Sequence, residues 1–125
     1  MKNVLIQFNR SKTTEIYRGI FFALISLFSC IGIRAADYTV EQWRVVDISL
    51  NSSVNYADPF NDVDVSATFT GPDGRIIVRP AYWDGDTSWK IRFAPTVIGN
   101  WTMTTTCTIT SNAGLHNISK TIQCL

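Results

Sequence analysis

Residues 63–74 read Val-Asp-Val-Ser-Ala-Thr-Phe-Thr-Gly-Pro-Asp-Gly, and this stretch predicts how the chain folds. Its apolar side chains recur at every second position from Val63 to Phe69, and polar side chains occupy the positions between them. A period of two is typical of a β-strand that buries one face and exposes the other. Proline and two glycines then supply the φ angles of a tight reversal. We therefore predict a β-hairpin whose second strand runs from Arg75 to Arg79.

Three further stretches alternate in the same way: residues 89–93, 101–109 and 118–125. Asp84-Gly85-Asp86 predicts a turn before the first of them, and residues 111–117 predict a loop before the last. Pro80 interrupts the second strand of the hairpin, so residues 81–83 are predicted to be a short extended piece of their own. The positions expected to face the core are Trp89, Ile91, Phe93, Trp101, Met103, Cys107, Ile109, Ile118, Ile122 and Cys124.

The stretch from Glu41 to Leu50 is less regular, because its apolar residues follow two phases. Trp43 and Val45 share one phase, and Val46 begins the other. Either a bulge or a strand that passes from one sheet to another would reconcile them. We expect the Trp43 side chain to pack in the core, as we do for Trp101.

These patterns predict about seven strands, since no segment after residue 36 shows a sustained helical period. Short strands separated by turn signals at regular intervals are typical of a β-sandwich. We therefore predict one all-β domain, an immunoglobulin-like antiparallel β-sandwich, over residues 37–125. Its 89 residues are enough for a modest core.

The first 36 residues have the composition of an export signal. Four basic residues and one acidic residue precede position 19, and residues 19–33 are an uncharged apolar run. Arg34 closes the run, and Ala35-Ala36 offers the small residues that a signal peptidase requires. We predict a signal peptide over residues 1–36, and hence a mature domain in the periplasm, at the cell surface or outside the cell.

Two alternatives exist for this segment. Residues 27–30, Leu-Phe-Ser-Cys, resemble a lipobox, in which Cys30 would be lipidated and become the mature N-terminus. Phe28 is bulky for that motif, and apolar sequence continues past the cysteine to Ile33, so we favour ordinary cleavage near Ala36. A retained membrane anchor is also disfavoured, because the apolar run has 15 residues and a spanning helix requires roughly 20.

The charge balance bears on one class of partner. The chain has a formal net charge of +1, but its first 36 residues hold five of the eleven basic residues and one of the ten acidic residues. Residues 37–125 therefore have a net charge of −3. A mildly acidic domain gives no indication of binding to nucleic acid or to an anionic membrane surface.

Cys107 and Cys124 are the two cysteines of the predicted mature domain, and exported domains can form disulfides. If the last two strands form a hairpin centred on residues 111–117, Cys107 lies opposite roughly position 121 and Cys124 opposite roughly position 104. The two cysteines are then offset by about 10 Å along the strands, whereas a disulfide requires Cα atoms within about 7 Å. We therefore predict two buried thiols.

The acidic and histidine residues form no recognisable catalytic or metal-binding motif. Asp58, Asn61, Asp62 and Asp64 lack the glycine and the terminal glutamate of an EF-hand calcium loop, so we interpret them as a capped turn and a solvated strand face. His116 is the single histidine and the chain has no CxxC pair, which leaves too few ligands for a zinc site. We predict no catalytic residue, no metal and no cofactor.

The tryptophans are the remaining indication of function. Trp83 and Trp89 flank the turn at residues 84–88, where exposed rings could stack on the face of a sugar. The alternative is that they pack in the core or against a neighbouring domain, because alternation places each tryptophan at an inward position. The candidate contact with a carbohydrate or a partner domain comprises Tyr82, Trp83, Asp84 and Trp89.

Several phrases of the sequence, taken together, resemble a known family. They are Val40-Glu41-Gln42-Trp43, Asp58-Pro59-Phe60-Asn61-Asp62-Val63, Tyr82-Trp83-Asp84-Gly85, Trp89-Lys90-Ile91-Arg92-Phe93-Ala94-Pro95 and Gly99-Asn100-Trp101-Thr102. Through them, residues 40–125 resemble the immunoglobulin-like N-terminal domain, itself of unknown function, that precedes (β/α)₈-barrel glycoside hydrolases of the apiosidase-like type.

The resemblance implies an accessory module and not an enzyme. In such proteins a catalytic barrel follows the domain, whereas this sequence stops at Leu125, where the barrel would begin. The implied partner is a glycoside hydrolase barrel outside this chain, and the module would pack against it and help to shape or support the substrate cleft. The alternative is a free-standing module that binds a polysaccharide or a protein through Trp83, Trp89 and neighbouring polar groups.

Overall fold

A computed structural model describes residues 34–125. The signal peptide predicted for residues 1–36 lies outside the described residues, apart from its last three, and it stays a prediction. Residues Ala36–Leu125 form one compact unit. No helix between residues 34 and 125 is long and apolar enough to cross a membrane.

Seven β-strands make up the described fold. They are β1 (Tyr38–Val40), β2 (Val46–Asn51), β3 (Val65–Thr70), β4 (Ile76–Trp83), β5 (Ser88–Phe93), β6 (Gly99–Cys107) and β7 (Ser119–Cys124). Threonine, valine and isoleucine recur in them because branched side chains fit a pleated surface. The prediction of an all-β chain with about seven strands is confirmed for the described residues.

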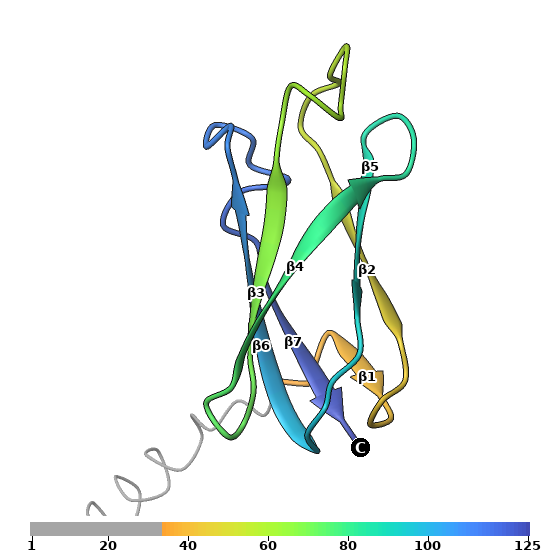
Figure 1. Cartoon of the computed structure of the whole chain (residues 1–125), viewed down its shortest axis with the longest axis vertical. Helices are drawn as coiled ribbons and strands as arrows, with labels where there is room; N and C mark the ends of the chain where they lie inside the picture. The colour runs from red at the N-terminus through yellow and green to blue at the C-terminus, as the bar shows by residue number, and fades with distance from the viewer. Residues whose placement is uncertain (1–33) are drawn as a thin grey trace, which may run out of the picture. The chain divides into compact units, whose positions relative to one another are not determined.

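The strands form a continuous hydrogen-bonded ladder in the order β1-β7-β6-β3-β4-β5-β2 (Figure 1). Neighbouring strands are antiparallel, except that β1 runs parallel to β7. Parallel neighbours cannot be joined by a short turn, and β1 and β7 are the first and the last strand along the chain. The ladder order makes β1 and β2 its two edge strands.

The hairpin predicted from residues 63–79 is present as β3 and β4. Its register joins Thr70 to Ile76 next to the turn. Gly74 has a φ of 81° there, a left-handed conformation that glycine adopts without the penalty of a Cβ atom. The predicted reversal is therefore confirmed, together with its physical reason.

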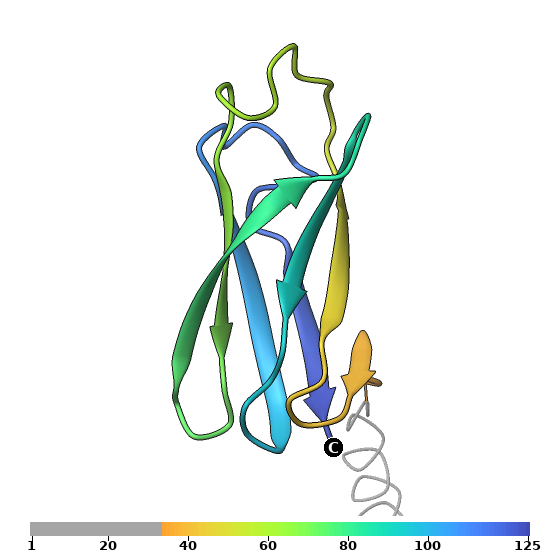
Figure 2. The ribbon, with the colours of Figure 1, turned by 45° about the vertical axis from the view of Figure 1, so that its right-hand side comes forward.

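β4 changes its partner at Pro80. Its first part pairs with β3 as far as the pair Ser66 and Pro80, and its last part, Ala81–Trp83, pairs with β5 (Figure 2). Proline has no amide hydrogen for a further ladder bond, which favours the separation of the two strands at this point. The predicted interruption at Pro80 is wrong for the strand itself, because β4 is continuous and only its partner changes.

The core is formed by inward side chains from both parts of the ladder. Phe69 of β3 stacks on Phe93 of β5 with ring centroids 3.8 Å apart, and Phe93 meets Trp101 edge-on at 5.2 Å. Trp101 is fully buried, as predicted, and so are most of the positions that alternation placed inward. Ile109 is an exception and is exposed, because β6 already ends at Cys107.

Trp43 does not pack in the core, so that prediction is wrong. Its side chain is 66% exposed and its φ is 66°. β1 pairs with β7 and ends at Val40, whereas β2 pairs with β5 and begins at Val46. Trp43 lies in the turn between β1 and β2. Of the two explanations for the change of phase, passage from one part of the ladder to another is the one observed. Strand alternation does not extend into a turn, so it could not place this side chain.

The last hairpin has a different register from the predicted one. Cys124 pairs with Gly99, and Cys107 lies beyond the paired residues. The connection is lopsided because it folds back on β6, where the amide of Thr105 donates to the carbonyl of Ile118 over 2.9 Å. Cys107 is eight residues from Gly99, the partner of Cys124, so the two cysteines are offset by about 27 Å along the strands. The predicted offset of about 10 Å was therefore too small. Both cysteines are free and buried.

Candidate functional site

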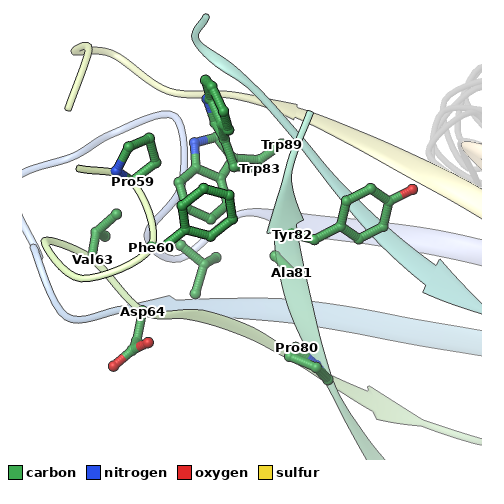
Figure 3. Close-up of a pocket in the computed structure, with 10 residues that line it drawn as sticks. Pro59, Phe60, Val63, Asp64, Pro80, Ala81, Tyr82, Trp83 and Trp89 are labelled. Atoms are coloured by element: carbon green, nitrogen blue, oxygen red, sulfur yellow. The ribbon is translucent and has the colours of Figure 1, made fainter. Parts of the chain in front are cut away.

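The separation of β3 from β4 leaves a hollow at one end of the module. It has a volume of about 180 Å³ and lies between the start of β3, the end of β4 and the β2–β3 loop (Figure 3). Asp64 is the only carboxylate in its lining. The rest is mostly apolar and includes Phe60, Val63, Val65, Ala81, Trp83 and Trp89.

A capped turn holds the β2–β3 loop beside the hollow. The Asp58 carboxylate accepts hydrogen bonds from the amide of Phe60 (3.2 Å) and from the side chain of Asn61 (2.7 Å). The Asp62 carboxylate accepts one from the amide of Asp58 (2.9 Å). The Asn61 hydrogen bond lowers the pKa of Asp58, because it favours the ionised form. The capped turn predicted for this acidic cluster is therefore confirmed.

Phe60 is a site residue that the sequence reasoning missed. Its side chain is 73% exposed, and its ring meets Trp83 edge-on with the centroids 5.8 Å apart. The only signal in the sequence was a large aromatic residue placed in a polar turn directly after Pro59. Phe60 is not an isolated exposed residue, because it belongs to the apolar lining of the hollow together with Val63 and Trp83.

Trp83 and Trp89 pair across β4 and β5, at the end of the two strands next to their turn. Trp89 is 3% exposed and belongs to the core, so its ring cannot stack on a sugar. Trp83 is half-buried, and its indole N–H donates to the carbonyl of Asp86 over 2.9 Å. That bond fixes the Trp83 ring against the β4–β5 turn. Because Trp83 is only half-buried, it is the tryptophan of this pair that solvent reaches.

Tyr82 points away from Phe60 and Trp83 (Figure 3). Successive side chains of a strand face opposite sides of the sheet, so the ring of Tyr82 lies on the outer face. There it pairs in register with Lys90 of β5, and it is 39% exposed. The predicted contact residues therefore do not form one platform, because Trp83 and Trp89 face inward whereas Tyr82 faces outward.

Two ion pairs lie on the outer strand face around Tyr82. Lys90 Nζ lies 2.7 Å from Asp84 Oδ2, and Arg92 Nε lies 2.9 Å from Asp47 Oδ1. The hydrogen bond with Asp84 raises the pKa of Lys90, and the hydrogen bond from Arg92 lowers the pKa of Asp47. Asp84 was predicted as a contact residue, and the structure places it in an ion pair with Lys90; its contact with a carbohydrate or a partner domain stays a prediction.

The chemistry that the hollow offers is that of an apolar contact. Cleavage of a glycosidic bond requires two carboxyl groups held about 5 to 9.5 Å apart across the sugar, and the hollow contains one. Among residues 34–125, no group of three or more histidine, cysteine, aspartate or glutamate side chains is arranged to hold a metal ion. The arrangement can bury an apolar side chain or the apolar face of a ring.

A helix-free ladder of seven strands with an apolar hollow defines, in residues 34–125, a small all-β module. Comparison with known families places this module more closely. Residues 39–108 match the model of a family described as a domain of unknown function, DUF5060, and the chain belongs to that family.

A solved structure similar to this chain is the crystal structure of a proposed glycoside hydrolase from Bacteroides vulgatus ATCC 8482. The two share 27% sequence identity with a TM-score of 0.61. The match covers 71% of this chain and 16% of the other, so this chain corresponds to a small part of that protein. No curated protein matches the chain. The relation to glycoside hydrolases indicated by residues 40–125 is confirmed at this level.

Proposed function

We propose that residues 37–125 form a non-catalytic accessory module of an exported glycoside hydrolase and that the module packs against the catalytic barrel of that enzyme. The observation that carries this proposal is the structural similarity of this chain to a proposed glycoside hydrolase, in a match that covers only 16% of that protein. The matched part, 71% of a chain of 125 residues, is much shorter than a (β/α)₈ barrel of about 250 residues. The described part of it contains strands alone, whereas a barrel alternates strands with helices.

The strand order supports an immunoglobulin-like β-sandwich as the architecture of the module. Phe69 and Phe93 stack face to face across the core from β3 and β5, and β4 passes from one of these strands to the other. Seven strands with a tryptophan buried between them are typical of such sandwiches. Trp101 of β6 is such a buried tryptophan, at 0% exposure.

The carboxylates around the site support a non-catalytic role. Asp58 caps a turn, and Asp47 and Asp84 are engaged with cations. A general acid of a glycosidase requires a raised pKa, whereas the pKa values of Asp47 and Asp58 are lowered. Lowered values keep these groups ionised, which suits anchors for loops and strands.

Binding of a polysaccharide is a second candidate function, and the exposure of Phe60 favours it. The Phe60 ring stands beside a hollow large enough to accept part of a sugar ring. The hydroxyls of a sugar require polar partners, however, and the lining of the hollow is mostly apolar. We therefore place the polysaccharide second.

The gene that encodes this chain provides the test of the proposed function. We expect a (β/α)₈ barrel with paired carboxylates to be encoded in frame after the codon of Leu125. Deletion of residues 37–125 from that enzyme should lower its thermal midpoint, because the barrel loses a packed neighbour. A locus that encodes no glycoside hydrolase would refute the proposal.

The export that forms part of this proposal has its own measurement. Mass spectrometry of the secreted or periplasmic protein should give a mature N-terminus near Ala36 or Asp37. An acylated Cys30 would instead make the protein a lipoprotein.

A further inference from the structure

The β1–β2 turn, the β5–β6 connection and the C-terminus lie at the same end of the module (Figure 1). These segments carry a second set of exposed apolar side chains. Trp43, Val45, Ile98 and Leu125 are exposed by 66%, 58%, 61% and 57% respectively. We call these four residues the C-terminal apolar surface. Single exposed apolar residues are common on proteins, but a group of large ones at one end of a small module is typical of a contact surface.

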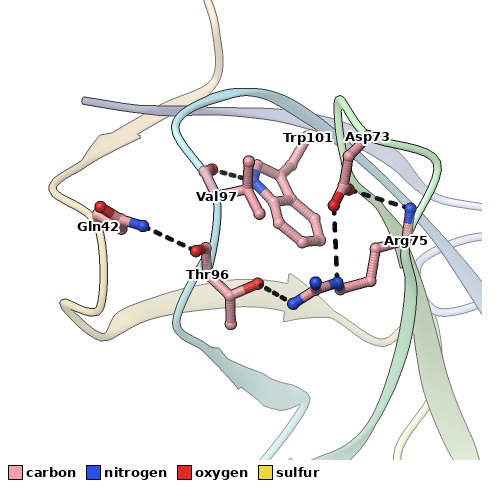
Figure 4. Close-up of polar contacts among 6 residues, drawn as sticks. All are labelled: Gln42, Asp73, Arg75, Thr96, Val97 and Trp101. Atoms are coloured by element: carbon pink, nitrogen blue, oxygen red, sulfur yellow. Dashed lines mark hydrogen bonds and ion pairs between the residues drawn. The ribbon is translucent and has the colours of Figure 1, made fainter.

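Hydrogen bonds join the segments that carry this surface. The amide of Trp43 donates to the carbonyl of Pro95 over 2.9 Å, and the amide of Gln42 donates to the carbonyl of Leu125 over 3.0 Å. The side-chain amide of Gln42 donates to the carbonyl of Thr96 over 2.8 Å (Figure 4). The β1–β2 turn, the β5–β6 connection and residue 125 are therefore held together as one platform.

The β5–β6 connection is also fixed from its other side. Arg75 Nη1 donates to Thr96 Oγ1 over 3.3 Å, and the indole N–H of Trp101 donates to the carbonyl of Val97 over 2.9 Å (Figure 4). Because Trp101 is fully buried, its bond ties the connection to the core. Ile98 follows directly, so its exposed side chain extends from a backbone that is already fixed.

Trp43 has a backbone conformation that bulky residues rarely adopt. Its φ of 66° lies in the left-handed region, where the Cβ atom of an L-residue crowds the backbone. Such strain persists where surrounding contacts impose it, and it is concentrated at functional positions. The indole is mostly in solvent, so burial within the described module does little to offset this strain. A contact outside the module would supply that burial.

We propose that the C-terminal apolar surface is where the module docks on the catalytic domain of its glycoside hydrolase, an inference that rests on the proposed function. Leu125 is part of the surface, and its carbonyl is fixed by Gln42. A domain that continues from Leu125 therefore begins beside Trp43 and Ile98. Covalent linkage raises the effective concentration of such a domain, so a modest apolar contact suffices for docking. The β2–β3 loop and the β4–β5 turn, beside which the hollow lies, are at the opposite end of the module (Figure 1).

The test uses the complete hydrolase chain that contains this module. Trp43→Asn removes the indole, and asparagine tolerates the left-handed conformation of residue 43. Ile98→Asn tests the same surface from a second segment. Phe60→Asn is the matched control, because it removes a similarly exposed aromatic ring near the opposite end. Calorimetry shows whether the module and the catalytic domain unfold together or separately.

We expect the wild type and Phe60→Asn to unfold with the two domains together. Trp43→Asn and Ile98→Asn should each separate the transitions and lower that of the module by about 5 °C or more. In the 125-residue chain alone, Trp43→Asn should not lower the transition, because asparagine tolerates the left-handed conformation of residue 43 and the indole is mostly in solvent. This result distinguishes lost docking from impaired folding.

Each other outcome overturns the inference in a recognisable way. Separation by Phe60→Asn alone would place the docking site at the hollow and leave the proposed function standing. Domains that unfold together in every variant would show that the C-terminal apolar surface makes no contribution. A dimer of the 125-residue chain that Trp43→Asn dissociates would make a second copy the occupant. A locus without a glycoside hydrolase would remove the proposed function and this inference together.

Discussion

Asn112 is 2% exposed and lies where the β6–β7 connection meets the β2–β3 loop. Its side-chain nitrogen donates to Ser52 Oγ (2.8 Å) and to the hydroxyl of Tyr56 (2.7 Å). Its side-chain oxygen accepts hydrogen bonds from the amides of Ser53 (3.1 Å) and Gly114 (3.2 Å). One amide group therefore satisfies polar groups of two loops that are distant in sequence. The loop beside the hollow is anchored through this residue.

Substitution Asn112→Asp should destabilise the module by about 3 kcal/mol, because a buried carboxylate replaces both donors and leaves Ser52 facing a negative charge. The measurement is the urea midpoint of unfolding, with the slope unchanged. The same substitution at Asn117, which is exposed in the same connection, is the control and should change stability by less than about 0.5 kcal/mol. Equal effects at the two positions would contradict the role of Asn112.

Asp37 ties the start of β1 to β7, and this contact depends on pH. Its carboxylate accepts the amide of Thr121 over 2.8 Å and the Thr121 hydroxyl over 3.2 Å. The hydrogen bond from the Thr121 amide is the main reason why the pKa of Asp37 is lowered from its ordinary value of 3.8. A depressed pKa means that the contact stabilises the fold above the unfolded pKa and is lost as the pH falls through the folded value.

An acid titration of residues 34–125 followed by NMR checks this contact. The amide proton of Thr121 should shift with a midpoint below 3.8, because protonation of Asp37 removes its charged acceptor. In Asp37→Asn, the shift of the Thr121 amide should no longer titrate. A Thr121 amide that titrates equally in both proteins would show that another group causes the shift.

At the scale of elements, β4 shapes the candidate site. Pairing with β3 as far as Pro80 and with β5 from Ala81 leaves the start of β3 without a neighbour on one side, and the hollow lies there. The alternation of the same strand then sends Tyr82 and Trp83 to opposite faces. A change of partner within one strand therefore both opens the hollow and divides the residues predicted to form one contact.

The β6–β7 pair leads to a prediction about the cysteines. Cys124 pairs with Gly99, eight residues from Cys107, so a disulfide within one chain would require the register of the hairpin to change. Residues 37–125, purified from an oxidising compartment and denatured without reductant, should contain two titratable thiols. Burial raises the pKa of Cys124, which also disfavours its oxidation in the folded protein. A mass lower by two hydrogens, with no free thiol, would mean that the hairpin is built differently.

At the scale of the whole module, residues 34–125 have a packed core, the apolar hollow and the C-terminal apolar surface. We expect residues 37–125 to show no hydrolysis of aryl glycosides or plant polysaccharides, because the hollow holds a single carboxylate. Product release over background is the measurement, with the complete hydrolase as the positive control. Turnover abolished by Asp64→Asn would show that the hollow is a catalytic site, contrary to this proposal.

Local patterns were sufficient for several strands and for two of the turns. Alternation predicted the buried faces of β3, β5 and most of β6, because the burial of one strand face is encoded at every second residue of that strand. The reversal at residues 71–74 and the capped turn at Asp58 were predictable for the same reason. The hydrogen bond from the Phe60 amide to Asp58 and the positive φ of Gly74 each involve residues that are close together in the sequence.

The tertiary structure alone decided how these elements meet. The lopsided connection sets the register of β6 with β7, and the passage from β1 to β2 leaves Trp43 in solvent. Phe60 reaches Trp83 only because the loop is anchored on Asn112 and on its own cap. Register, strand partners and loop positions depend on contacts between residues far apart in the chain, so no local period records them. The sequence by itself therefore determined an all-β chain with its turns, while distant packing decided which side chains share a surface.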